Sequence, residues 1–168
     1  MNINSRDEYG RTALMLATNG NHTKVVQYLT SLSNVKIYAK DKYGGHAALN
    51  AAINGRLDVL KLLVQKDPNV ADLKGNREKS PLVVAARKGD LDIVKYLTSQ
   101  QNVNKNSQDG YGATPLIWAA YYNHPKVVQL LLEKGADTSV KDNNGYTALE
   151  FAKDKGYTYM IKLLQKSK

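Results

Sequence analysis

The sequence of 168 residues contains no cysteine, and tryptophan and phenylalanine each occur only once. The absence of cysteine excludes a disulfide framework, a thiolate nucleophile and cysteine-ligated zinc or iron–sulfur clusters. Long hydrophobic runs are also missing, because the longest, Leu116 to Tyr122, is far shorter than the roughly 20 residues of a transmembrane helix. The first residues lack the basic and apolar segments of a secretory signal. We therefore expect a soluble protein that does not insert into a membrane.

Acidic residues are in the minority, with 15 Asp and Glu against 24 Lys and Arg, and the formal net charge is +9. The excess is spread along the chain, whereas a nucleic-acid footprint is typically one basic patch or stripe. We therefore predict that the chain does not bind nucleic acid. One local concentration remains, and it comprises Lys74, Arg77, Lys79, Arg87 and Lys88. This cluster favours a partner protein with an acidic surface, although a solvated basic loop would have the same composition.

Five segments of similar sequence repeat along the chain, and their first residues are separated by 34, 34, 34 and 33 positions. The segments are Thr12–Thr18, His46–Ala52, Ser80–Ala86, Thr114–Ala120 and Thr147–Lys153. An Asn or a Gly follows at the same distance in every unit, and two apolar pairs come after it. Self-similarity at this period is typical of a repeat protein.

Each repeated feature has a local physical role. Thr or Ser followed by Pro or Ala is a good helix start, because the hydroxyl caps a free backbone N–H; His46, in the same position, should cap weakly. Gly or Asn suits the left-handed residue that ends a helix. The apolar pairs place one stripe along a second helix. Each unit is therefore predicted to be a turn, a short helix, a turn and a short helix, and the units must stack to bury their apolar faces.

The fourth unit carries the most complete pattern, with Asp109-Gly-Tyr-Gly-Ala-Thr-Pro-Leu-Ile-Trp-Ala-Ala120 and Val127-Val-Gln-Leu-Leu-Leu-Glu-Lys-Gly-Ala-Asp137. Through these motifs the chain resembles the ankyrin-repeat family over nearly its whole length. The resemblance implies an all-α ankyrin-repeat solenoid of helix–turn–helix units joined by β-hairpin-like loops. It also implies a concave face formed by the hairpin tips and the first helix of each unit.

We predict a single domain over residues 1–168, with repeats at approximately 7–40, 41–74, 75–108, 109–141 and 142–168. The first and last units should act as polar caps. The third unit departs from the pattern, since Glu78 stands where the other units have the turn glycine. Its hairpin should therefore deviate from the geometry of the family.

Nothing in the sequence assembles a catalytic site. His22 and His124 occupy the same repeat position, directly after the turn residue, which favours a structural hydrogen bond over catalysis. The phosphate-binding glycine loop, the dinucleotide-binding motif and the zinc-protease motif are all missing. We therefore predict no enzymatic activity, no cofactor and no metal ion.

Tyrosine supplies eleven of the aromatic residues, and several tyrosines share positions at the predicted hairpin tips or at the end of a first helix. Tyrosine offers a large contact area at a small loss of rotamer freedom, as in protein-binding hot spots. The alternative is that each tip tyrosine only shields its own turn. The predicted partner-binding residues are Tyr9, Tyr43, Arg77, Lys79, Arg87, Lys88, Tyr111, Tyr121, Tyr122 and Tyr146. In contrast, Tyr28, Tyr96 and Trp118 are predicted to lie in the core.

The favoured function is that of a non-catalytic, monomeric protein–protein interaction module in the cytoplasm. One alternative is an accessory targeting or substrate-recruiting domain of a larger enzyme or of a secreted bacterial effector, which would act in the host cytoplasm. An electrostatic binder of RNA or anionic lipid is a further alternative that the spread of charge disfavours.

Overall fold

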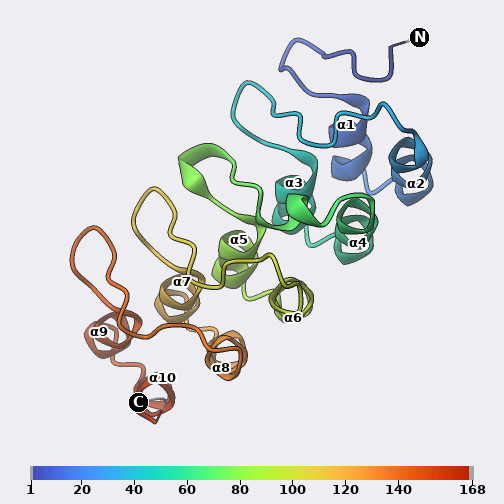
Figure 1. Cartoon of the computed structure of the whole chain (residues 1–168). Coiled ribbons are helices and arrows are strands. Elements are labelled where there is room, and N and C mark those ends of the chain that lie inside the picture. The colour runs from blue at the N-terminus through green and yellow to red at the C-terminus, as the bar shows by residue number, and fades with distance from the viewer. Residues whose placement is uncertain (1, 167–168) are drawn as a thin grey trace.

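The computed structural model describes residues 2–166, and its α-helices form five consecutive pairs arranged in two parallel rows (Figure 1). The inner row contains α1 (Ala13–Asn19), α3 (Ala47–Ile53), α5 (Pro81–Lys88), α7 (Pro115–Tyr121) and α9 (Ala148–Asp154). The outer row contains α2 (Thr23–Ser31), α4 (Leu57–Lys66), α6 (Leu91–Thr98), α8 (Pro125–Glu133) and α10 (Thr158–Gln165). Two short 3-10 helices, η1 (Pro68–Asp72) and η2 (Asn76–Glu78), lie before α5. The predicted all-α repeat solenoid is confirmed.

Long loops project from the inner row at the start of each unit (Figure 1). Within residues 2–166 the β pairing is limited to one isolated bridge between Arg6 and Thr12. These loops therefore keep a hairpin-like course without forming strands. None of the helices in this part of the chain is long and apolar enough to cross a membrane.

The inner helices begin at the predicted capping residues. In each unit the cap accepts the backbone N–H three residues later at 3.2 to 3.4 Å, from Thr12, His46, Ser80, Thr114 and Thr147. The expectation that His46 caps weakly is wrong in geometry, because its Nδ1 accepts from Leu49 at 3.2 Å, as short a bond as that of any hydroxyl cap here. The imidazole is fully buried, and burial lowers its pKa to about 4. His46 is therefore neutral near pH 7.

The inner helices end as predicted, at residues with positive φ. These residues are Asn21, Gly55, Gly89, Asn123 and Gly156, with φ between 55° and 75°. At Gly89 the neighbouring unit approaches closely, since an added Cβ would lie 2.6 Å from Nδ1 of His124. Nε2 of the same histidine lies 3.1 Å from the carbonyl oxygen of Arg87. This histidine thus ties one turn to the next, which is the structural role predicted from its repeat position.

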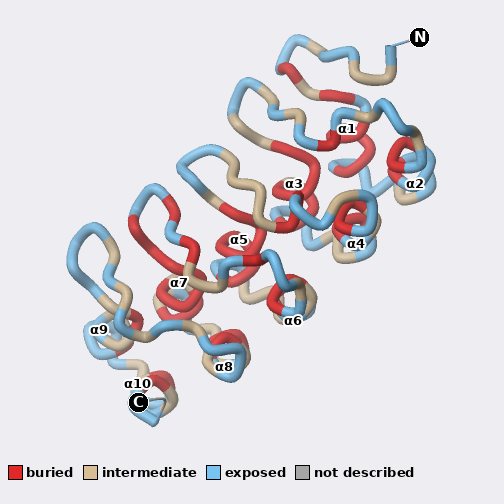
Figure 2. Tube along the Cα trace, in the orientation of Figure 1, coloured by how far each residue is buried: buried red, intermediate tan, exposed pale blue. Residues whose placement is uncertain are grey.

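The core lies between the two rows of helices and runs the length of the array (Figure 2). The paired alanines of α3, α5 and α7 are all fully buried, so the inner helices pack closely. The prediction that Tyr28 lies in the core is wrong, because its side chain is 65% exposed. Val26 and Leu29 are the buried residues of α2, and Tyr28 follows Val26 by two residues, which turns it to the opposite side of the helix. Tyr96 is half-buried against the core.

Candidate binding groove

The loop tips and the inner helices α3, α5, α7 and α9 border three adjoining pockets. The tip pocket, of about 430 Å³, is lined by Asp41, Tyr43, Gly45, Leu49, Asn50, Ile53, Asn76, Arg77 and Lys79. The cationic pocket, of about 420 Å³, is lined by Leu49, Ile53, Lys79, Val84, Arg87, Lys88 and Tyr122. The aromatic pocket, of about 260 Å³, is lined by Tyr111, Ala113, Ile117, Trp118, Tyr121, Tyr122, Asp142, Asn144 and Phe151. Because neighbouring pockets share lining residues, we treat the three as one groove.

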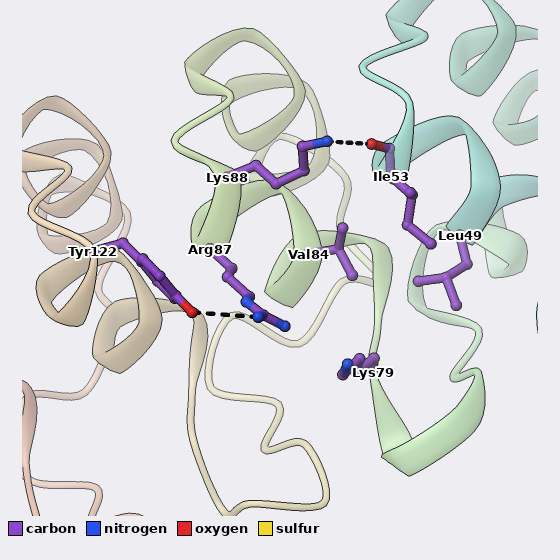
Figure 3. Close-up of a pocket in the computed structure, with 7 residues that line it drawn as sticks. All are labelled: Leu49, Ile53, Lys79, Val84, Arg87, Lys88 and Tyr122. Atoms are coloured by element: carbon purple, nitrogen blue, oxygen red, sulfur yellow. Dashed lines mark hydrogen bonds between the residues drawn. The ribbon is translucent and has the colours of Figure 1, made fainter.

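The cationic pocket takes its charge from the end of α5 and the residue before the cap of α5 (Figure 3). Nη2 of Arg87 donates a hydrogen bond to the hydroxyl of Tyr122 at 3.3 Å. Nζ of Lys88 donates to the carbonyl oxygen of Ile53 at 2.5 Å. Both basic side chains therefore bridge from α5 to a neighbouring unit, one in each direction. Three of the five residues of the basic cluster, Lys79, Arg87 and Lys88, therefore line one pocket.

The floor of the same pocket is apolar. Leu49 and Val84 are 4% and 8% exposed and form, with Ala52, a small buried cluster separate from the main core. Ile53 is 42% exposed at the edge. A ligand in this pocket would thus meet hydrophobic side chains below and cations around it.

Trp118 lies at the centre of the aromatic pocket. Its ring centroid is 6.1 Å from that of Tyr111, 5.8 Å from that of Tyr121 and 5.9 Å from that of Tyr122. Its indole N–H donates to Oδ2 of Asp109 at 2.9 Å, which fixes the orientation of the ring. The prediction that Trp118 belongs to the core is only partly right: the side chain packs against the core, but it is only partly buried and also lines the groove.

The loop tip of the third unit deviates from the others, as predicted. Arg77 and Glu78 both have positive φ, 52° and 55°, which is strained for residues other than glycine. The carbonyl oxygen of Arg77 accepts the N–H of Gly110 at 2.7 Å, and its guanidinium donates to the hydroxyl of Tyr111. The irregular tip thus places a cation against the aromatic tip of the next unit.

Positive charge prevails in the groove, since Arg77, Lys79, Arg87 and Lys88 face only two lining carboxylates. Both carboxylates already bind backbone N–H groups of their own turns. Asp41 accepts from Tyr43 and Gly45 at 2.8 and 2.7 Å, and Asp142 accepts from Asn144 and Tyr146 at 3.0 and 2.9 Å. Within residues 2–166 neither carboxylate pairs with a basic residue of the groove. The positive charge of the groove is therefore not neutralised by a carboxylate of its lining.

The arrangement offers binding surface and little that resembles catalytic machinery. Within residues 2–166 no group of three or more His, Asp and Glu side chains is placed to hold a metal ion. His46 is buried as a helix cap, and His124 lies in a turn. Nothing in the groove pairs a nucleophile with a base.

Comparison with known proteins identifies the family. The family profile described as ankyrin repeats (3 copies) matches residues 1–73 and 82–168, and the profile described as ankyrin repeats (many copies) matches residues 49–98. The chain belongs to the ankyrin-repeat family. Ankyrin repeats are typically non-catalytic modules that mediate protein interaction.

Three similar proteins span very different lengths. The crystal structure of an ankyrin repeat domain from Acinetobacter baumannii AYE is 30% identical, covers 99% of this chain and 86% of that one, and superposes with a TM-score of 0.91. The protein YahD of Escherichia coli (strain K12) is 32% identical over 98% of this chain and 83% of its own length. Ankyrin repeat and SAM domain-containing protein 6 of Rattus norvegicus is 30% identical over 83% of this chain. This chain spans only 16% of that rat protein.

Two of the predicted binding residues lie beside the groove of this ankyrin-repeat array and do not line its pockets. Tyr9 is at the tip of the first unit, 42% exposed, with the guanidinium of Arg11 4.7 Å from its ring centroid. Tyr146 packs against Phe151, with ring centroids 5.1 Å apart. The other eight predicted residues line at least one pocket.

Trp118 is the principal groove residue that sequence reasoning missed. A usable signal was present, because Trp118 is three residues before Tyr121 and four before Tyr122, so the three share one helix face. The second unit also carries the polar Asn50 at the repeat position of Trp118, which indicates a position open to solvent. Phe151 occupies the same repeat position as Trp118 and Asn50, so the second signal applied to it as well, whereas Leu49 carried no comparable signal.

Proposed function

We propose that this ankyrin-repeat chain is a non-catalytic interaction module that binds a partner protein through the groove formed by the loop tips and inner helices. The observation that supports this most is the combination of exposed tyrosines with basic side chains that have no carboxylate partner. Aromatic residues and arginine are enriched at the centres of protein interfaces. A contiguous exposed aromatic surface is also costly to maintain without a use.

We further propose that the partner presents an acidic surface to the groove. The cations of the groove would raise the association rate and penalise basic partners. The module would act as a monomer in the cytoplasm, or in the host cytoplasm if the protein is a secreted effector. Light scattering after size-exclusion chromatography tests the oligomeric state, with 18.6 kDa expected for the monomer.

Affinity capture from a lysate of the source or host tests the use of the groove. The test variant is Tyr111→Ala with Tyr122→Ala, because both side chains line the groove and are 44% and 41% exposed. The matched control is Tyr28→Ala with Tyr159→Ala, which removes two tyrosines that are 65% and 61% exposed on the outer helices.

We expect the groove variant to lose at least about tenfold in affinity for the captured partner, which corresponds to the loss of about 1.4 kcal/mol. The control should bind like the wild type, and both variants should keep the thermal stability of the wild type. Equal capture by both variants would contradict the assignment of this face. A large loss of stability in the groove variant would show that these tyrosines support the fold instead.

A second candidate is that the repeat array recruits a target for a larger protein. The observation that favours it is the rat relative, in which the matching ankyrin repeats occupy a small part of the length. The same groove would then select the target, and the capture experiment would return a substrate of the larger protein. Binding of RNA or anionic lipid would instead collapse with modest added salt, so the salt dependence of the captured complex separates that alternative from both.

A further inference from the structure

Arg87 joins the two pockets that carry most of the chemistry of the groove. Its Cζ lies 5.1 Å from the ring centroid of Trp118 and 5.5 Å from that of Tyr122. The same side chain lines the cationic pocket together with Lys79 and Lys88. A ligand that reaches the guanidinium of Arg87 therefore also touches the edge of the aromatic pocket.

The aromatic pocket has the size and lining to receive one bulky side chain. Its volume of about 260 Å³ exceeds the roughly 150 Å³ of a cavity that accepts benzene. Ile117 and Ala113 extend the hydrophobic lining between the rings. Offset and edge-to-face ring contacts, which already relate the rings of this pocket, are the geometry in which a further aromatic ring gains most.

A cationic side chain fits this pocket poorly, because cations of the chain already lie over its rings. They are Arg77 over Tyr111 at 5.6 Å, Arg87 over Trp118 and Tyr122, and Lys155 over Tyr121 at 5.3 Å. A further cation would face like charge from three directions, at sites where the attraction of the ring faces is already used. The carboxylate of Asp142 at the rim is held by two backbone N–H groups. The pocket therefore favours an uncharged, apolar occupant.

The cationic pocket calls for the opposite chemistry. Lys79, Arg87 and Lys88 line it, and its lining contains no carboxylate. Within residues 2–166 none of the three basic residues forms an ion pair. Asp or Glu side chains of a ligand would supply the missing charge, and a guanidinium beside an aromatic surface pairs with carboxylates particularly well.

We infer that the groove recognises a short segment of the partner in which one bulky apolar side chain, aromatic by preference, lies close to acidic side chains. The apolar anchor enters the aromatic pocket, and the acidic residues meet Arg87, Lys79 and Lys88. Neighbouring packed helices are about 8–10 Å apart, and an extended chain advances about 3.3 Å per residue. The spacing from α7 to α5 therefore sets the acidic residue about three positions from the anchor. This inference rests on the proposed function and specifies the partner's chemistry.

Selection of random 12-residue peptides displayed on phage against the whole chain tests the inference. We expect an enriched consensus of Phe, Trp or Leu with Asp or Glu two to four residues away. A consensus built on Lys or Arg, a consensus without acidic residues, or no enrichment at all would each overturn it.

Selected peptides that lack tryptophan can then be measured directly, because Trp118 is the only tryptophan of the chain and lines the aromatic pocket. Binding should shift its fluorescence emission, whereas an unchanged emission would place the anchor elsewhere. Replacing the anchor of the peptide by Ala, or its acidic residues by Lys, should weaken binding at least about tenfold.

Two variants of the protein complete the test. Arg87→Ala should lower the affinity for the acidic peptide at least about tenfold. The variant should then bind the acidic peptide no more tightly than a peptide with Asn and Gln in place of Asp and Glu. Lys95→Ala is the matched control, since Lys95 is an exposed cation on the outer helix α6, and it should change affinity less than twofold. If the tyrosine variant loses the natural partner but no such peptide motif emerges, the proposed function stands and this inference fails.

Discussion

The buried histidine cap of α3 predicts a specific loss of stability in mild acid. His46 is fully buried, and desolvation lowers its pKa to about 4 from an ordinary value of 6.5. The unfolded chain therefore takes up a proton below about pH 6.5, whereas the folded chain does not until about pH 4. Because the unfolded state binds more protons in this window, the free energy of unfolding falls as pH decreases.

The magnitude follows from the size of the pKa shift. Each pKa unit corresponds to about 1.36 kcal/mol, so the loss contributed by His46 is about 2 kcal/mol at pH 5 and approaches about 3 kcal/mol near pH 4. A domain of ordinary stability unfolds at a cost of about 5–15 kcal/mol. The effect of this one residue is therefore large enough to measure by urea unfolding, followed by circular dichroism at pH 7.5 and at pH 5.

The matched control is His46→Thr, which restores the residue that caps α1, α7 and α9. Threonine caps without titrating, so the difference between pH 7.5 and pH 5 should shrink by about 2 kcal/mol in this variant. The smaller Thr side chain also leaves space in the core, which lowers the free energy of unfolding at every pH. The comparison therefore uses the difference between pH 7.5 and pH 5 within each protein. Burial raises the pKa of Asp72. Its protonation therefore increases the free energy of unfolding as the pH falls, which opposes the effect of His46 and is equal in both proteins. An equal pH dependence in both proteins would refute the reasoning.

Three further predictions concern the turns and the core, and each is checked by the free energy of unfolding. Gly89→Ala should destabilise by about 1 kcal/mol for the positive φ and by a further 1–3 kcal/mol for the clash with His124. In Gly156→Ala, where φ is also positive but nothing lies within 4 Å of the added Cβ, only the first cost should appear; equal losses would show that the contact does not matter. Leu97→Ala should cost about 3 kcal/mol, because the side chain is fully buried in the core. Tyr28→Ala should change the free energy of unfolding by less than about 0.5 kcal/mol. A loss above about 2 kcal/mol would show that the Tyr28 side chain is buried in the core after all.

The helical architecture was predictable because its signals are local. The capping hydroxyl of Thr114 and the left-handed turn at Asn123 each depend on a few neighbouring residues. The repeat spacing of 34 residues then required stacking, since a single pair of short helices cannot bury its apolar stripe. The same spacing placed Tyr43 and Tyr111 at equivalent tips, where both are exposed.

The composition of the groove was only partly predictable. Periodicity assigned Trp118 to the core because the position is apolar in most units. However, one face of each inner helix packs on the core and another borders the groove, and Trp118 lines the groove. Whether an apolar residue faces the core or the groove depends on how far neighbouring units approach on each side. That distance is set by the packing of neighbouring units, and the sequence of a single repeat does not encode it.

The sequence by itself determined the pair of α-helices in each unit, the ends of the inner helices and the stacking of the units, because hydrogen bonds and hydrophobic periodicity within about 34 residues decide these features. Only the tertiary structure decided that Arg87 lies against Trp118 and Tyr122. These contacts join residues of adjacent units at about one repeat length, and the packing of α5 against α7 brings them together. The fold of this protein is thus encoded within its repeats, and its binding surface arises between them.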